Sequence, residues 1–171
     1  MATGQRTEAV ERFWQAFREA AGAAEDQVGY DVVSFDDSPE TATELAGLVV
    51  GGRKRATAGL LRQFGADGEP LPVIGGYVVL VDGDGRPRAV WRTKELRLGP
   101  LVSVDDAFAW DEGEGDRTRA SWLDAHRAFF GRLAERGGFA LHDGIETVFE
   151  RFEVVWPPEI ADAPHGTSPA K

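Results

Sequence analysis

The sequence predicts an α+β fold, in which a small mixed β-sheet is covered by amphipathic helices. Three observations predict it: a strand–turn–strand pattern in the middle of the chain, helical apolar periodicity on both sides of that pattern, and an alternating apolar run near the end. With 171 residues, 10 Phe and 5 Trp, the chain is long enough to bury one core. We therefore expect one compact domain with appendages at both ends.

The first helix is expected between Thr7 and Ala21. Aromatic and aliphatic side chains recur there at spacings of three and four, Thr7 can cap the start, and Gly22 can end the helix. Such an aromatic stripe is typical of a packing surface. We expect this helix to dock on the main domain.

A second helix is expected over residues 39–50, after a loop over residues 30–35. Ser38 is a good N-cap, Pro39 suits the first helical position, and the glycine pair 51–52 can supply a left-handed C-terminal residue. The chain should therefore turn sharply at the glycines. A strand can begin at Ala56.

A β-hairpin is expected in the middle of the chain. Residues 75–81 form a β-rich run, residues 82–85 read Asp-Gly-Asp-Gly, and residues 89–98 form the second strand. Simple alternation would place Trp91, Thr93 and Glu95 on one face of that strand. This face is either part of a site or an exposed face with a cross-strand ion pair.

The last third of the sequence predicts two helices and a closing strand. A short helix should start near residues 103–106, and a longer one should run over residues 117–133 with His126 on its aromatic face. The acidic run 111–116 lacks the spacing of an EF-hand, and we expect Asp116 to cap the longer helix instead of binding a metal. The closing strand spans 147–156, and residues 157–171 are expected to be a flexible tail.

Composition excludes several classes of function. The formal net charge of −10 disfavours tight binding to duplex DNA. The chain has no cysteine, its three histidines are scattered, and no apolar run approaches the roughly 20 residues that span a bilayer. We expect a cytoplasmic protein with no metal, no cofactor and no membrane association, and the oligomeric state stays open, a homodimer included.

The segment Arg53-Lys54-Arg55-Ala56-Thr57 reverses this charge locally. Three adjacent cations and a hydroxyl can face an anionic or polar ligand, or they can form a solvated turn after a helix. Residues three apart on a strand point to opposite faces. Lys54 and Thr57 can therefore meet only if the turn extends through Lys54.

The order of several motifs resembles the ASCH domain family, whose members have a PUA-like fold. The matching segments run from about Tyr30 to Trp156 and are Ser34-Phe35-Asp36-Asp37-Ser38-Pro39, Leu48 to Ala58, Glu69-Pro70-Leu71-Pro72, Asp82 to Pro87, Glu112-Gly113-Glu114-Gly115-Asp116, and Trp122 with His126 and Phe129-Phe130. The Gly-x-Lys-x-x-Thr element and the Glu-Gly-Glu-Gly-Asp run are typical of the longer bacterial members. The resemblance implies a small mixed β-barrel with flanking helices and a cleft for RNA or a nucleobase, preceded here by an extra N-terminal helix and linker over residues 1–29.

The resemblance also implies a chemistry. Some members look like amidohydrolases that remove an acyl group from the exocyclic nitrogen of cytidine derivatives with a lysine, a threonine and a glutamate, which fall by position on Lys54, Thr57 and Glu95. Lysine can act as the base toward threonine when its pKa is depressed, and Arg53 and Arg55 would supply the neighbouring positive charge.

Other residues of the sequence bear on how a ligand would bind. Tyr77 or Trp91 could stack on a base. Gly59 and Gly76 stand where polar residues are common in the family.

The sequence leaves three functions open. The first is hydrolysis of an N4-acylated cytosine nucleoside or base. The second is binding or cleavage of short single-stranded RNA, with Arg53 and Arg55 as phosphate contacts. The third is binding of a ligand without turnover.

Overall fold

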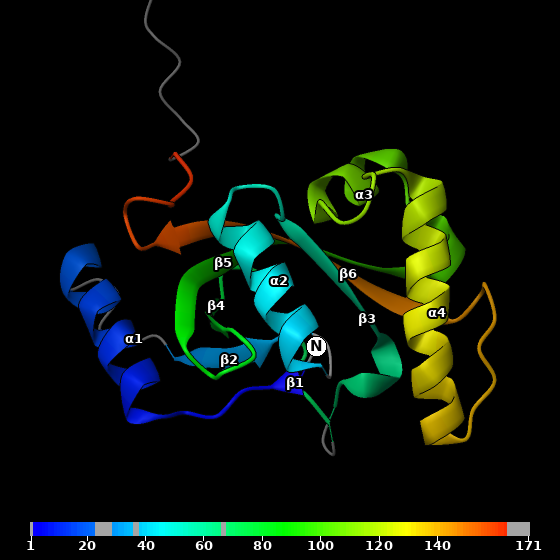
Figure 1. Cartoon of the computed structure of the whole chain (residues 1–171), viewed down its shortest axis with the longest axis horizontal. Helices are drawn as coiled ribbons and strands as arrows, with labels where there is room; N and C mark the ends of the chain where they lie inside the picture. Colours follow the sequence, from blue (N-terminus) through cyan, green and yellow to red (C-terminus); the bar gives the residue numbers. More distant parts are fainter. Residues whose placement is uncertain (1, 23–28, 36–37, 66–67, 164–171) are drawn as a thin grey trace, which may run out of the picture.

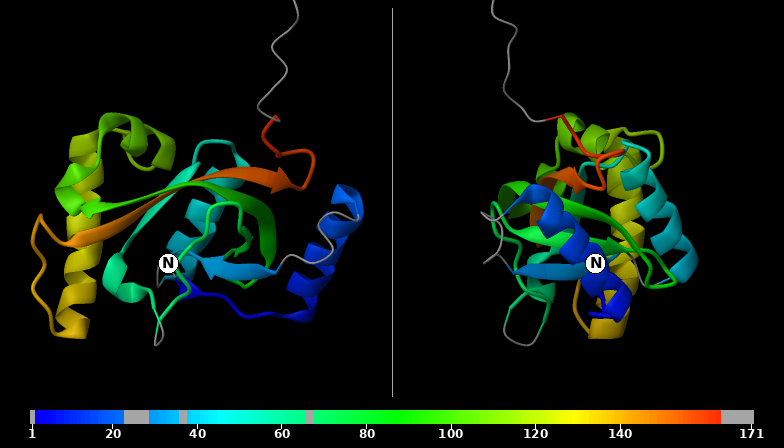
Figure 2. Two further views of the ribbon diagram at one scale, coloured as in Figure 1. Left: turned by 180° about the vertical axis from the view of Figure 1, so that it is seen from behind. Right: turned by 90° about the vertical axis from the view of Figure 1, so that its left-hand side faces the viewer.

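A curled six-stranded sheet forms the centre of the protein. The computed structural model describes residues 2–22, 29–35, 38–65 and 68–163. The strands lie in the order β1-β2-β4-β5-β6-β3, and the sheet is strongly curved (Figures 1 and 2). The strands are β1 (Ala2–Thr3), β2 (Tyr30–Ser34), β3 (Ala56–Leu60), β4 (Tyr77–Val81), β5 (Pro87–Pro100) and β6 (Glu146–Trp156).

Strand pairing gives a mixed sheet, as expected. β2 and β4 run parallel, and the other neighbouring pairs are antiparallel. Within the described residues the two outermost strands, β1 and β3, do not pair with each other. The sheet is therefore an open half-barrel.

In the described ranges, four α-helices cover this sheet. They are α1 (Glu8–Ala21), α2 (Pro39–Val50), α3 (Asp106–Glu112) and α4 (Arg119–Gly137), with short 3-10 turns η2 (Leu61–Gln63) and η3 (Leu101–Ser103). In Figure 1, α1 and α4 lie at opposite ends of the sheet and α2 lies between them. The helices pack on the sheet through three buried clusters. In the first, α1 packs over β2 and β4; in the second, α2 packs over β4, β5 and β6; in the third, α3 and α4 pack over β3 and β6.

Helix capping follows the sequence closely. Thr7 accepts a hydrogen bond from the Val10 amide at the start of α1, and Ser38 does the same for Thr41 at the start of α2. At the end of α2, Gly52 has a positive φ of 78°, which glycine adopts at little cost. The cap of α4 was predicted wrongly: it is Thr118, and Asp116 instead accepts hydrogen bonds from the amide and hydroxyl of Thr118.

Two expectations about irregular segments were also wrong. Residues 30–34 form strand β2, because they pair with β4, a strand that lies more than 40 residues away in the sequence. The described part of the C-terminal segment packs back on the domain. Asp162 hydrogen-bonds with the backbone of Val154 and forms a bidentate contact with Arg55, while residues 164–171 lie outside the described residues.

A bulge in β5 changes which side chains share a face. Thr93 pairs with Phe152, but Glu95 pairs with Arg151, so two steps along β5 match one step along β6. Such a bulge reverses the alternation of side chains beyond it. Glu95 therefore lies on the opposite face from Trp91 and Thr93.

Candidate functional site

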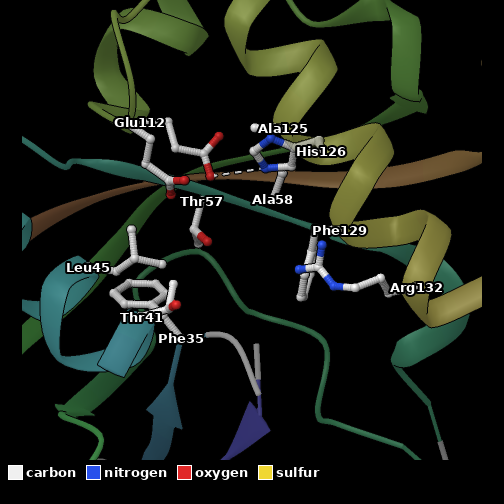
Figure 3. A pocket seen from close by; sticks show the side chains of 11 residues that line it. Phe35, Thr41, Leu45, Thr57, Ala58, Glu112, Ala125, His126, Phe129 and Arg132 are labelled. Carbon is white, nitrogen blue, oxygen red and sulfur yellow. Dashed lines mark ion pairs between the residues drawn. The ribbon is translucent and has the colours of Figure 1, made fainter. Parts of the chain in front are cut away.

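A pocket of about 280 Å³ lies between α2 and α4. Figure 3 shows its two walls, with Phe35, Thr41 and Leu45 on one side and His126, Phe129 and Arg132 of α4 on the other. Thr57 and Ala58 of β3 lie between these walls. Glu112 and Glu114 complete the lining. Segments from three parts of the chain, residues 35–45, 57–58 and 112–132, therefore meet at this pocket.

Lys54 lies buried directly beside this pocket. Its side chain is 1% exposed, and its Nζ lies 3.2 Å from Glu112 Oε1 and 2.5 Å from Glu114 Oε1. A buried ammonium is costly unless it is paired and hydrogen-bonded, and these two carboxylates supply both conditions. The three residues form the charged centre of the site.

The glycines of the acidic run allow it to approach Lys54. Gly113 ends α3 with a φ of 75°, and a Cβ on it would lie 2.3 Å from the carbonyl oxygen of Arg53. Only glycine tolerates both the left-handed backbone and this close approach. The backbone at Gly113 therefore lies against Arg53, so Glu112 and Glu114 flank the next residue, Lys54.

Glu112 connects Lys54 to two aromatic groups of α4. Its Oε2 accepts a hydrogen bond from Trp122 Nε1, and its Oε1 lies 3.5 Å from His126 Nε2. Burial raises the pKa of Glu112, but the charges of Lys54 and His126 and the hydrogen bonds outweigh it and hold the pKa at about 2. Glu112 is therefore ionised at neutral pH.

Lys54 carries its proton in this arrangement. Burial alone would lower the pKa of the ammonium, but the opposite charges and hydrogen bonds of Glu112 and Glu114 outweigh it, and the pKa is raised. The expectation of a depressed pKa caused by Arg53 and Arg55 is thus corrected. In the free protein Lys54 is a fixed positive charge instead of a base.

His126 is held in a defined orientation on α4. Its ring stacks on Trp122 at a centroid distance of 3.7 Å, and its Nδ1 lies 3.0 Å from the carbonyl oxygen of Trp122. Because a carbonyl only accepts, Nδ1 must carry a proton and donate. Nε2 can then donate to Glu112 only in the imidazolium form. The histidine is buried, as expected, and it also lines the pocket.

Thr57 presents a hydroxyl to the same pocket. Lys54 precedes β3 and lies in the turn, since the amides of Arg53 and Lys54 both donate to the Leu48 carbonyl. The turn therefore extends through Lys54, as a meeting of Lys54 and Thr57 requires. Within the described part of the chain, Oγ1 of Thr57 makes no hydrogen bond, so it is available to a ligand.

The structure does not bring Glu95 to this pocket. Its carboxylate accepts a hydrogen bond of 3.0 Å from Arg151 Nη1, in a separate hollow lined also by Arg55 and Asp162. The cross-strand ion pair was the alternative interpretation of this face. The β5 bulge turns Glu95 away, and the carboxylates that lie beside Lys54 are those of Glu112 and Glu114.

Arg53 and Arg55 make structural contacts outside the pocket. Arg53 Nη2 donates to the carbonyl of Gly115, which ties the acidic run to the turn. Arg55 contacts Asp162 and donates to the carbonyls of Val49 and Lys54. Neither side chain lines the pocket, so the expected ligand contacts are not supported by the geometry.

Tyr77 and Trp91 are both in the core. Tyr77 packs against Trp14 and Phe17 of α1. Trp91 is fully buried, stacks on Phe152 at 4.4 Å, and donates from Nε1 to Glu150. Neither ring can stack on a ligand in this pocket without rearrangement of the core. Among the described residues, the rings that do line it are those of Phe35, Phe129 and His126.

Gly59 and Gly76, which were expected to replace polar residues near the cleft, lie away from the pocket. A Cβ at Gly59 would contact the ring of Phe64, and one at Gly76 would approach the Val73 carbonyl at 2.8 Å. Neither residue lines the pocket. The glycine at each position is explained by local packing.

Sequence reasoning missed Glu112, Glu114, Phe35 and Arg132 as site residues. The acidic run was visible, and a buried lysine requires a carboxylate, but the burial of Lys54 could not be read from the sequence. Phe35 belongs to the matching segment Ser34-Phe35-Asp36-Asp37-Ser38-Pro39, but it was not assigned to the site; Asp36 and Asp37 of that segment lie outside the described residues. In the described ranges, no group of three or more acidic or histidine side chains could hold a metal, and no helix there is long and apolar enough to cross a membrane.

The fold and this site define a PUA-like domain, and the comparisons with known proteins identify the family. A family model described as the ASCH domain matches residues 31–156, so the chain belongs to the ASCH domain family. A crystal structure of an ASCH domain from Lactobacillus crispatus JV V101 is similar, with a TM-score of 0.79 and 26% identity over 86% of this chain and 94% of that chain.

A crystal structure of a protein from Enterococcus faecalis V583 is also similar to this chain. It has a TM-score of 0.77 and 34% identity over 86% of this chain and 88% of that chain. No curated protein matches the chain.

Proposed function

We propose that the pocket between α2 and α4 is the active site of an amidohydrolase that removes an acyl group from the exocyclic amine of a cytosine-type nucleoside. The observation that carries the proposal is the free hydroxyl of Thr57 in the pocket beside the buried ammonium of Lys54. Acyl transfer uses a hydroxyl as nucleophile and a fixed positive charge that stabilises the oxyanion, and both lie at this site. The aromatic rings of Phe35 and Phe129 give a flat, uncharged base two surfaces to stack on.

The charged residues have distinct roles in this proposal. Thr57 Oγ1 attacks the acyl carbon, its proton passes to Nε2 of a neutral His126 at the pocket wall, and the oxyanion forms on the side of the pocket nearest the Lys54 ammonium. The C–N bond then breaks, the amine leaves with a proton from the same group, and water releases the acyl group from Thr57 as a carboxylic acid. Glu112 and Glu114 act as positioning residues, because they hold Lys54 in place and keep it charged.

The test is a spectrophotometric assay with N4-acetylcytidine. We expect turnover by the wild-type protein and loss of at least about 100-fold in kcat for Thr57→Val, which keeps the shape of the side chain but removes the hydroxyl. Thr57→Ser should retain part of the activity. Glu95→Gln is the matched control, since the carboxylate lies outside the pocket, and it should retain the wild-type rate.

Two outcomes would refute the proposal. One is absence of turnover by the folded wild-type protein, and the other is equal turnover by the wild type and Thr57→Val. A strong effect of Glu95→Gln would restore the original assignment of the glutamate. Binding of short single-stranded RNA is the second candidate, and the structure favours it less because Arg53 and Arg55 are held by protein groups.

A further inference from the structure

The side chains that α4 contributes to the pocket wall differ in chemical type along the helix. Ala125, His126, Phe129 and Arg132 line it, and their spacing places them on one face of the helix. His126 lies at the end where Glu112 is found, whereas Arg132 lies six residues further on, which is about 9 Å along the axis. The pocket therefore has an ion-pair end, an aromatic middle and a cationic end.

Arg132 differs from most of the arginines that the structure describes, and shares its lack of a charged partner with Arg62. It is exposed, and within the described residues its guanidinium makes no hydrogen bond or ion pair. Its neighbour is the ring of Phe129, at 5.6 Å from the guanidinium carbon to the ring centroid. Figure 3 shows the side chain extending from α4 toward the pocket beside Phe129. The chain has 29 acidic residues, yet this cation faces the pocket.

The charge balance of the pocket makes Arg132 the place for an anion. Lys54 is already matched by Glu112 and Glu114, so the ion-pair end repels a phosphate. Among the described lining residues, Arg132 is the one permanently charged cation. A guanidinium also presents paired donors that match phosphate oxygens.

We propose that Arg132 binds a phosphate on the ribose side of the ligand, so that the preferred substrate is a pyrimidine nucleotide instead of a neutral nucleoside. This inference rests on the proposed function. The reacting exocyclic amine would lie at the Lys54 end, the base would stack between Phe35 and Phe129, and the ribose would extend toward Arg132. The length between His126 and Arg132 is of the order of one nucleoside.

Binding of the reaction products tests the inference without turnover. Isothermal titration calorimetry at low salt would compare cytidine with cytidine 5′-monophosphate on the wild type, Arg132→Ala and Arg62→Ala. Arg62 is the matched control, because it is an exposed arginine over an aromatic ring, Phe139, and does not line this pocket. A dinucleotide, CpC, distinguishes a free monophosphate from the phosphodiester of an RNA strand.

We expect the monophosphate to bind the wild type at least about tenfold more tightly than cytidine, as for a charged hydrogen bond. Arg132→Ala should abolish this preference, and Arg62→Ala should keep it. Equal binding of both ligands, or a preference that survives Arg132→Ala, would overturn the inference. Turnover of acetylated nucleosides without a phosphate preference would overturn this inference alone, whereas absence of both binding and turnover would overturn the proposed function with it.

Discussion

Glu150 is a buried carboxyl group whose protonation should control stability near neutral pH. It is 1% exposed, its Oε1 accepts hydrogen bonds from Trp91 Nε1 and Thr93 Oγ1, and its Oε2 has no partner among the described residues. Burial raises its pKa from the ordinary 4.5 to about 7, against the two hydrogen bonds. The folded protein therefore keeps a proton that the unfolded chain has already lost.

The sign and size of the effect follow from this difference. Between pH 4.5 and about 7 the folded state binds more protons than the unfolded chain, so the free energy of unfolding falls as pH rises. The full stability contribution of the protonated form is present below pH 4.5, and the loss is nearly complete by about pH 8. At about 1.36 kcal/mol per pKa unit, the total is about 3 kcal/mol, of which about 2.5 kcal/mol falls between pH 5 and pH 8.

The substitution Glu150→Gln removes this titration and keeps an oxygen that can accept from Trp91 and Thr93. Urea unfolding followed by tryptophan fluorescence would give the free energy of unfolding at pH 5 and pH 8. From pH 5 to pH 8, we expect the free energy of unfolding of the variant to rise by about 2.5 kcal/mol relative to that of the wild type. Glu95→Gln, an exposed carboxylate on the neighbouring strand, is the control. A constant difference between Glu150→Gln and the wild type at both pH values would refute the reasoning.

Three further predictions concern the site and its supports. Glu112→Gln leaves Lys54 with one carboxylate and should lower the free energy of unfolding by about 3 kcal/mol at pH 7, as measured by urea unfolding. Because the pKa of Glu112 is about 2, the difference between variant and wild type should shrink as pH falls from 4.5 toward 2, and a constant difference would contradict this role. Gly113→Ala should cost more than Gly22→Ala by at least about 1 kcal/mol in thermal unfolding, because both have positive φ but only Gly113 would also clash with Arg53; equal costs would contradict the role of the close approach. Arg55→Ala should lower stability by about 1 kcal/mol in thermal unfolding and leave the turnover of N4-acetylcytidine unchanged. A large loss of turnover would indicate that Arg55 contributes to the site.

Local chemistry made much of the fold predictable. The caps Thr7 and Ser38 set the starts of α1 and α2, and the Asp-Gly-Asp-Gly turn set the hairpin, because each depends on neighbours within a few residues. Strand β2 was missed because its pairing with β4 comes from distant residues. Sequence alternation also could not reveal the β5 bulge, where one extra residue reverses the face of Glu95.

The sequence indicated the segment that carries the candidate site, but not the carboxylates around Lys54. Lys54 and Thr57 are close in the sequence, so the turn that joins them could be inferred. Glu112 lies 58 residues beyond Lys54, and the contact depends on how α3 ends at Gly113. The expected partner Glu95 had the right residue type and a plausible strand position, which shows that alternation alone does not assign a face when a strand can bulge.

The burial of Lys54 also changes what the basic segment means for function. Three consecutive cations suggested a surface for phosphate groups, but Arg53 and Arg55 are bound by protein oxygens and Lys54 is matched by two carboxylates. The local charge at the ion-pair end of the pocket is therefore negative, as it is for the whole chain. A phosphate chain gains nothing there, whereas the uncharged acylated base of the proposed function can reach the Thr57 hydroxyl without bringing another negative charge to the carboxylates. The same charge distribution that disfavours a nucleic acid track thus supports the proposed small ligand with a neutral reacting end, whose phosphate we have proposed to lie at Arg132.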